Sequence, residues 1–543
     1  IGLIEGDEYL SLKKDVVLSW PYKDCVLEGG QTKEDGKRNE IFWNETLAPD
    51  DISRLFEPKV ITCFKRIDKN GEKSAKEIKD NNNLIIKGNN LLALHSLKEK
   101  FRGKVKLIYI DPPYNTGTED DTFAYNNSFK HSTWLTFMKN RLDVAKDLLK
   151  EDGFIAIAID HVELYYLGSI ADEIFGRENR IGLVTILHNP KGRNQSKFFS
   201  ANSEFMMIYA KNILKANFRN VAISDDVKES FDQEDDISKF RYEPFMRART
   251  AWSRENRPKN WYPIYVSKDL KKITHEKISG YHEVFPITND GKGMAWKNIK
   301  ESFIELNENN YFIAKKEKGE IRIHHKYREQ QVLKNVWTDK KYQSEFHGTN
   351  LLKKLMGDNL FSYPKSLYAV LDTIKIMTSD NDIILDFFGG SGTTAHAVLE
   401  LNKEDGGKRQ FIICEQMDYV ENVTKERVKK VIKNNKDGEF VYCELLKCNE
   451  QYIDKIKKSK NKSDIKKIWT EIKDKGYLSY KFDIKKIDAS AKDFESLSLD
   501  DQKRFLLEAL DKNQLYVNLG DIDDKDYKVS VEDKKLNKMF YNK

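Results

Sequence analysis

The sequence predicts an α/β protein built on a largely parallel sheet with helices on both faces. Two observations carry this prediction. Short apolar runs rich in β-branched residues alternate with helical segments, and the alternation occurs twice, before and after a long irregular stretch. The chain has 543 residues, 39% of them hydrophobic, which is long enough for two to four domains.

The first half of the alternation begins at residue 84. LIIK is typical of a strand that ends in a Gly-Asn turn, and LLALHSLKEK is typical of the helix after it. VKLIYI at Val105–Ile110 predicts a second strand, Trp134–Lys150 a helix, and FIAIAI at Phe154–Ile159 a third strand.

The second half begins after residue 361. IILDF at Ile383–Phe387 predicts a strand, followed by a glycine-rich turn and the helix AHAVLEL, and FIIC at Phe411–Cys414 predicts the next strand. Outside the two halves, LAPDDISRLF predicts a helix at Pro49–Leu55. The Lys-rich C-terminal region has the pattern of solvated amphipathic helices.

These patterns divide the chain into four expected parts, and the first residues lack an initiator Met, so we expect a trimmed start. The parts are a lead-in segment over 1–80, an α/β domain in two halves over 81–186 and 351–448, an inserted mixed α+β domain over 187–350, and a helical C-terminal domain over 449–543.

Composition excludes several classes of protein. No apolar stretch approaches the length needed to cross a bilayer. Five cysteines are few and odd in number, which favours a reducing cytoplasm over a disulfide scaffold, and we expect no metal site. The net charge of +6 is unevenly spread, because residues 187–350 carry 30 Lys and Arg against 22 Asp and Glu, a net +8 that leaves −2 elsewhere. This places a candidate nucleic-acid surface on the inserted region.

A first candidate site is the turn Asp111-Pro112-Pro113-Tyr114 after the strand VKLIYI. Two prolines cannot continue a central strand, so they predict a rigid turn at the carboxyl end of that strand, where open α/β sheets bind ligands. A carboxylate and a carbonyl side by side can accept both hydrogens of an exocyclic amino group, and a tyrosine ring can stack on its base. A tight loop with an exposed Asp is the alternative.

A second candidate is the loop FFGGSGTT after the strand IILDF. Its glycines let the backbone approach a ligand closely, although a purely structural turn would have the same sequence, and no G-K-[ST] follows to make it a phosphate-binding P-loop. Glu415 ends the next strand, at the place where a carboxylate can accept the hydroxyls of a ribose. A surface glutamate is the alternative.

DPPYNTG followed far downstream by DFFGGSGTTAHAV resembles the β group of S-adenosylmethionine-dependent amino-group DNA methyltransferases. With ELNKEDGGKRQFI, LEGGQTKED and KKLNKMFY, the resemblance extends to the modification (Mod) subunit of Type III restriction-modification systems. It implies a Rossmann-like methyltransferase sheet, a target-recognition domain inserted between the motifs, and a bacterial cytoplasmic enzyme that is associated with the nucleoid through DNA. It also implies double-stranded DNA as substrate, a homodimer, and a separate helicase and nuclease subunit.

The resemblance also implies roles for single residues. Asp111 and the carbonyl of Pro112 would hold the amino group of a flipped-out adenine, Pro113 would shape the turn, and Tyr114 would stack on the base. The cofactor would be bound by residues of the glycine loop and its surroundings, Asp386, Phe388, Gly390, Gly392, Glu415 and Lys365, the last in the pattern FSYPK. The family favours Gly-Asp-Asn where this chain has Asn at position 89.

The inserted region contains a cluster of basic residues beside aromatic ones, which suits contacts to phosphates and base edges. The candidate DNA-binding residues are Arg247, Arg249, Arg254, Arg257 and Lys259, close to Trp252 and Trp261. A solvated basic face is the alternative. Asp at position 111 favours adenine N6 as the methyl acceptor. Cytosine N4 methylation and a recognition subunit active only within a larger restriction complex remain the alternative functions.

Overall fold

The computed structural model describes residues 4–5, 8–9, 18–29, 42–44, 49–116, 129–192, 198–219, 231–237, 239–328, 333–358, 360–479, 482 and 491–542. These residues form two compact units, one from 1–219 with 334–543 and one from 220–333. Among the described helices, none is long and apolar enough to cross a membrane. Part of the acidic stretch that begins at Asp225, and most of LEGGQTKED, lie outside the described residues.

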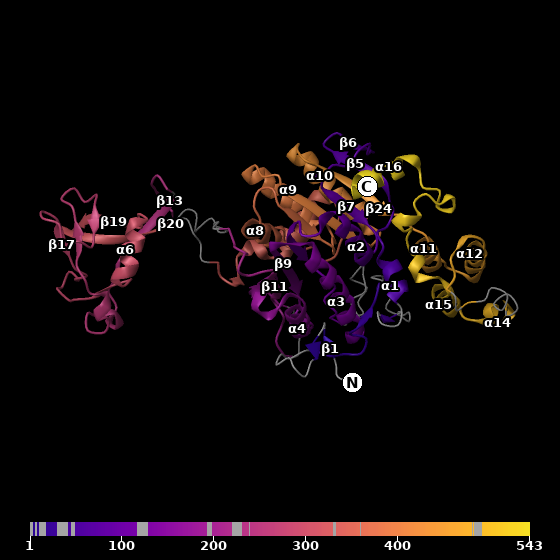
Figure 1. Ribbon diagram of the computed structural model, residues 1–543, viewed down its shortest axis with the longest axis horizontal. Coiled ribbons are helices and arrows are strands. Elements are labelled where there is room, and N and C mark those ends of the chain that lie inside the picture. Colours follow the sequence, from indigo (N-terminus) through magenta and orange to yellow (C-terminus); the bar gives the residue numbers. More distant parts are fainter. Residues whose placement is uncertain are drawn as a thin grey trace. The chain divides into compact units, whose positions relative to one another are not determined.

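The larger unit is organised around a mixed sheet that contains eleven strands within its described residues (Figure 1). Across the sheet, the strands follow the order β21, β10, β11, β9, β8, β22, β23, β7, β24, β5 and β6. In chain order their bounds are β5 Ile61–Asp68, β6 Gly71–Ser74, β7 Leu84–Lys87, β8 Val105–Ile110, β9 Leu149–Ile159, β10 Arg180–Ile186, β11 Glu204–Ala210, β21 Val336–Trp337, β22 Ile383–Asp386, β23 Gln410–Glu415 and β24 Glu439–Leu445.

The middle of this sheet is parallel and its margins are antiparallel. From β9 through β8, β22, β23 and β7 to β24, each strand pairs with its neighbour in parallel. β11 and β5 run antiparallel to β9 and β24, on the two sides of this parallel core. The strands predicted at Val105–Ile110, Phe154–Ile159, Ile383–Phe387 and Phe411–Cys414 are therefore confirmed, and so is the largely parallel sheet.

Helices cover both faces of the sheet. One group contains α2 (Asn90–Phe101), α3 (His131–Leu148) and α4 (Leu164–Phe175), which pack against one another. The other contains α8 (Leu367–Met377), α9 (Thr393–Asp405) and α10 (Lys425–Asn435), and Figure 1 shows the two groups on opposite sides of the strands. The predicted α/β class with helices on both faces is confirmed.

The contacts of Asn89 account for an asparagine, in place of the aspartate that the family favours, at the start of α2. Its side-chain oxygen accepts from Leu91 N at 3.0 Å, capping the helix, while its side-chain nitrogen donates to Glu28 O at 3.1 Å and Gly29 O at 3.3 Å. A carboxylate has no hydrogen to donate, so an aspartate would face two carbonyl oxygens with like charge.

The two ends of the chain contribute to the same unit. The helix predicted near Pro49 is α1 (Pro49–Phe56), and the C-terminal helices are α11 (Glu450–Lys458), α12 (Lys462–Lys475), α14 (Ala491–Ser496), α15 (Leu499–Ala509) and α16 (Val531–Tyr541). The side chain of Asn537 on α16 bonds both the N–H and the C=O of Ile61, at 2.9 and 2.6 Å. The last helix is thus hydrogen-bonded to strand β5 of the sheet.

The smaller unit has its own sheet and core. The sheet contains β12 (Gln233–Glu234), β13 (Lys239–Pro244), β19 (Phe312–Glu317) and β20 (Glu320–Arg328), with helix α6 (Lys300–Glu308). Phe245, Trp296, Phe303 and Phe312 pack together in its centre. Strands β11 and β21, which lie in the expected insert 187–350, belong instead to the sheet of the larger unit.

Short 3-10 and π-helical turns aside, the other elements of the described residues are β1 (Ile4–Glu5), β2 (Glu8–Tyr9), β3 (Cys25–Val26), β4 (Trp43–Asn44), β14 (Met246–Arg247), β15 (Ile264–Val266), β16 (Ile273–Thr274), β17 (His282–Val284), β18 (Ala295–Trp296) and α7 (Leu351–Met356).

Candidate active site

The two sequence motifs meet because their strands are neighbours. β22 lies beside β8 in parallel, with Leu385 opposite Ile108. The turn after β8 and the glycine loop after β22 therefore leave the same edge of the sheet, although residues 111 and 387 are far apart in the chain. A pocket lies at this edge and encloses about 580 Å³ free of protein atoms, part of it open to solvent.

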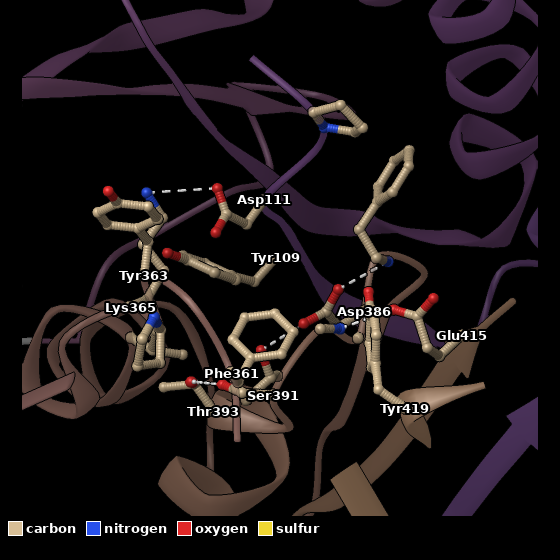
Figure 2. A pocket seen from close by; sticks show the side chains of 17 residues that line it. Tyr109, Asp111, Phe361, Tyr363, Lys365, Asp386, Ser391, Thr393, Glu415 and Tyr419 are labelled. Carbon is tan, nitrogen blue, oxygen red and sulfur yellow. Dashed lines mark hydrogen bonds and ion pairs between the residues drawn. The ribbon is translucent and has the colours of Figure 1, made fainter. Parts of the chain in front are cut away.

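The pocket brings together most of the predicted catalytic and cofactor residues. Those that line it are Asp111, Pro113, Lys365, Asp386, Phe388, Gly390 and Glu415. Figure 2 shows Asp386 and Glu415 at one end, Asp111 at the other, and Tyr109 between them. Pro112, Tyr114 and Gly392 do not line it, although each adjoins a lining residue in the chain.

The turn after β8 is fixed by bonds on both sides of its prolines. The indole Nε1 of Trp134 donates to the carbonyl of Pro113 at 2.9 Å. Asn115 has a φ of +54° and donates from its side chain to Glu163 Oε1 at 2.7 Å. Both partners are buried, so the turn holds Asp111 at the pocket without needing a ligand to order it.

A cluster of charged groups surrounds Asp111. The ammonium of Lys365 lies 3.3 Å from Asp111 Oδ1 and also pairs with Glu204, while the Tyr114 hydroxyl donates to Glu204 Oε2 at 3.1 Å. Burial raises the pKa of Asp111, and the Lys365 ammonium opposes that rise. The two carboxylates raise the pKa of Lys365 although its burial acts in the opposite direction. The ammonium is thus shared between two acids.

Asp386 anchors the glycine loop from within. Its Oδ1 accepts from Phe388 N at 3.0 Å and its Oδ2 from the Thr394 hydroxyl at 2.6 Å. Burial raises the pKa of Asp386 to about 7, against the effect of these two donors. Within the loop, Gly390 and Gly392 have φ of +50° and +79°, conformations that side chains rarely adopt.

Glu415 is buried and closes the same end of the pocket. Its Oε2 accepts from Gly390 N at 2.8 Å, and its Oε1 accepts from Gln416 N at 2.8 Å and Met417 N at 2.9 Å. Tyr419 also donates to it. Burial raises the pKa of this carboxyl, while the donors lower it. The surface-glutamate alternative is therefore wrong, since the side chain is only 3% exposed.

Several residues that complete the site are not apparent from the sequence. Tyr109, Phe361 and Tyr419 form aromatic walls, of which the pattern FSYPK indicates only Phe361. One feature of the sequence could have identified Glu204: it is an acid at the start of the otherwise apolar strand EFMMIYA. No such feature marks Arg427, because it lies in the Lys-rich helix sequence KERVKKVIK. It is buried and donates to the hydroxyls of Ser391 and Thr393 in the glycine loop.

The predicted DNA-binding residues all lie in the smaller unit, and all five are exposed. The guanidinium groups of Arg247 and Arg257 lie 4.7 and 4.9 Å from the Trp252 ring, and Arg254 lies 4.7 Å from the Trp261 ring. The aromatic side chains therefore hold three of the arginines in place on the surface. No ring contact accompanies Arg249 or Lys259 among the described residues.

The known proteins that this chain resembles include Mod subunits of Type III restriction-modification enzymes. The chain is 32% identical to the probable Type III restriction-modification enzyme HindVI Mod subunit of Haemophilus influenzae, over all of this chain and 87% of that protein. It is 34% identical to the EcoPI Mod subunit of Escherichia phage P1, over 64% of this chain and 59% of that protein. An alignment with the crystal structure of the M1.HpyAVI–SAM complex covers 64% of this chain and 98% of that one, at 15% identity and a TM-score of 0.31, too low to compare site geometry.

A family model described as DNA methylase matches residues 105–426. The matched segment begins at strand β8, includes both motifs of the pocket and ends beside Arg427. The chain therefore belongs to the DNA methylase family of N6 and N4 methyltransferases.

Proposed function

We propose that the pocket transfers a methyl group from S-adenosylmethionine to the N6 amino group of an adenine flipped out of duplex DNA. The observation that carries the proposal is the shared pocket of Asp111 and the glycine loop, which puts an acceptor for amino hydrogens beside a loop suited to a cofactor. Membership of the DNA methylase family supports the reaction class.

The residues at the glycine-loop end fit the proposed cofactor. Phe361, Phe388 and Tyr419 offer apolar walls for an adenine ring, and the glycines permit close approach of the backbone. Glu415 is a carboxylate at the end of β23, suited to ribose hydroxyls. Because backbone N–H groups and Tyr419 already use most of its acceptor sites, a ribose would displace the Tyr419 hydroxyl.

Bound S-adenosylmethionine supplies a methyl group that is already activated by its sulfonium. The protein therefore needs no nucleophile of its own, and its task is to align the acceptor nitrogen and exclude water. Asp111 and the carbonyl of Pro112 accept the two amino hydrogens, which stabilises the positive charge that develops on the nitrogen. Tyr114 stacks on the flipped base and Pro113 maintains the turn.

The exposed arginines of the smaller unit contact DNA, and the expected recognition domain 187–350 reads its sequence. By similarity to the HindVI and EcoPI Mod subunits, the chain serves as the modification subunit of a Type III restriction-modification system. We further propose a homodimer, a separate helicase and nuclease subunit as partner, and a place in the bacterial cytoplasm, bound to the nucleoid through DNA.

The test is methylation by the purified chain alone. Duplex DNA is incubated with the chain and methyl-labelled S-adenosylmethionine and then digested to nucleosides. We expect label in N6-methyladenosine, and label in N4-methylcytidine would replace the adenine assignment by the cytosine alternative. Asp111→Ala is expected to abolish transfer while cofactor binding, measured by calorimetry, persists. Absence of label with the intact chain would favour the recognition-subunit alternative, and normal turnover by the variant would contradict the role of Asp111.

A further inference from the structure

Glu204 is a buried acid near the site that belongs to neither of the two sequence motifs. It is the first residue of β11, the strand next to β9 in the sheet. Its side chain is only 8% exposed, and its Oε2 receives both the Lys365 ammonium and the Tyr114 hydroxyl. β11 thus supplies an anion to the cluster around Asp111 without itself lining the pocket.

Lys365 pairs with two carboxylates, Asp111 and Glu204, and the availability of Asp111 depends on which of them holds the ammonium. Its side chain is 11% exposed, so its charge is largely removed from water and needs an anion close by. Asp111 is the more exposed partner, at 29%, and lies 3.3 Å away, a looser pair than the one with Glu204. If Glu204 carried no charge, the ammonium would depend on Asp111 alone.

An ammonium held tightly by Asp111 would compete with the substrate. Both use the same carboxylate oxygens as acceptors, and Lys365 carries a full charge whereas an amino group does not. The Tyr114 hydroxyl donates to the same Glu204 oxygen and accepts from Lys365, so Glu204 also helps to hold the ring proposed to stack on the base. Glu204 therefore controls two neighbours of the target amino group at once.

Resting on the function proposed above, we propose that Glu204 is a positioning residue that holds the Lys365 ammonium and the Tyr114 ring so that the Asp111 carboxylate stays available to the target amino group. It does not touch the substrate itself.

The proposal has a consequence for pH dependence. The groups that face Asp111 are Lys365, Glu204 and Tyr114, together with Tyr109 on β8 and Asp386 on β22. Burial raises the pKa of Asp111 most, the Lys365 ammonium lowers it, and the negative charge of Glu204 raises it. His188 also faces Glu204 and helps keep it ionised. Removing the charge of Glu204 takes away one of the two effects that raise the pKa of Asp111 and leaves burial as the other, so that pKa falls.

The decisive variant is Glu204→Gln, assayed for methyl transfer across pH. We expect kcat to fall about tenfold to a hundredfold, the loss typical of a misplaced reacting geometry. We also expect the acid limb of the kcat profile to move to lower pH, because a nearby negative charge that raises the pKa of Asp111 is lost. Glu204→Asp keeps the charge and is expected to retain the wild-type limb with a smaller loss of rate.

Asp372 offers a matched control in the same unit. It is a carboxylate that is 4% exposed and likewise receives a lysine, Lys341 at 2.7 Å, and a tyrosine hydroxyl, Tyr342 at 2.8 Å, but it does not line the pocket. Asp372→Asn is expected to lower the thermal unfolding midpoint while leaving the acid limb in place.

Three results would separate the possibilities. If Glu204→Gln kept the wild-type kcat and the wild-type acid limb of the pH profile, the inference would be overturned and the proposed function would stand. Equal losses of rate in Glu204→Gln and Asp372→Asn, with neither limb displaced, would reduce Glu204 to a structural role and also overturn it. No transfer by the wild-type chain would instead overturn the proposed function on which the inference rests.

Discussion

The guanidinium of Arg427 is joined to the Ser391 side chain inside the larger unit, with Nη1 donating to Oγ at 2.9 Å. The same nitrogen donates to the Thr393 hydroxyl at 2.8 Å. Arg427 is fully buried, and burial lowers its pKa to about 9. Within the described part of the chain, no carboxylate lies at ion-pair distance from it. Its Nε and Nη2 lie 3.3 and 3.2 Å from His396 Nδ1 on α9, so the glycine loop and His396 together hold this buried cation.

Arg427→Met is expected to loosen the loop and weaken S-adenosylmethionine binding about tenfold, equal to about 1.4 kcal/mol. The physical reason is that Ser391 and Thr393 line the pocket and lose the donor that orients them. Calorimetric titration with the cofactor measures the effect.

Lys430 on the same helix provides the control, since it donates to the carbonyls of Leu355 and Met356 and not to the loop. Lys430→Met is expected to leave cofactor affinity unchanged. If both variants bound the cofactor as the wild type does, Arg427 would have no part in ordering the loop.

Asp386 predicts a pH dependence of stability. Its pKa is raised from 3.8 to about 7 in the folded chain, so unfolding releases a proton between these values. The free energy of unfolding should therefore fall as pH rises from about 4 to about 7, by on the order of 4 kcal/mol in total from this group, and level off above. Asp386→Asn should remove that part of the pH dependence. Denaturant unfolding of both proteins at pH 4 and pH 8 measures it, and parallel stability curves would disprove the prediction.

The arginines of the smaller unit predict a salt-dependent loss of DNA binding. Charge reversal at Arg254 or Arg257 should weaken DNA binding more than cofactor binding. It should also reduce the slope of log affinity against log salt by about 1 for each phosphate that the protein no longer neutralises. Filter binding over a series of salt concentrations measures both quantities.

Lys292 is the matched control for these reversals, because it is exposed in the same unit but pairs with Asp290 at 3.0 Å. Lys292→Glu is expected to change the slope less than either arginine variant. Equal losses of DNA and cofactor binding in the arginine variants would count against the smaller unit as the DNA-binding element.

The parallel strands and both loops of the pocket could be predicted from local sequence. Buried strands such as Val105–Ile110 are continuous apolar runs, and the prolines and glycines that end them act through their own backbone restrictions. Local rules of this kind need no knowledge of distant parts of the chain. They failed for β5, which lies next to the edge strand β6. Its sequence ITCFKRID is only partly buried and has no clear period, and it pairs with β24, far later in the chain.

Which charges gather around the pocket depends on the tertiary structure. Local sequence predicts that Asp111 and the glycine loop end strands, but Glu204 and Arg427 come next to them only through the packing of β11 and α10. A buried charge is recognisable by its partners, and partners that are distant in the chain leave no local pattern. The unequal sharing of Lys365 between Asp111 and Glu204 likewise depends on distances that exist only once the sheet is assembled.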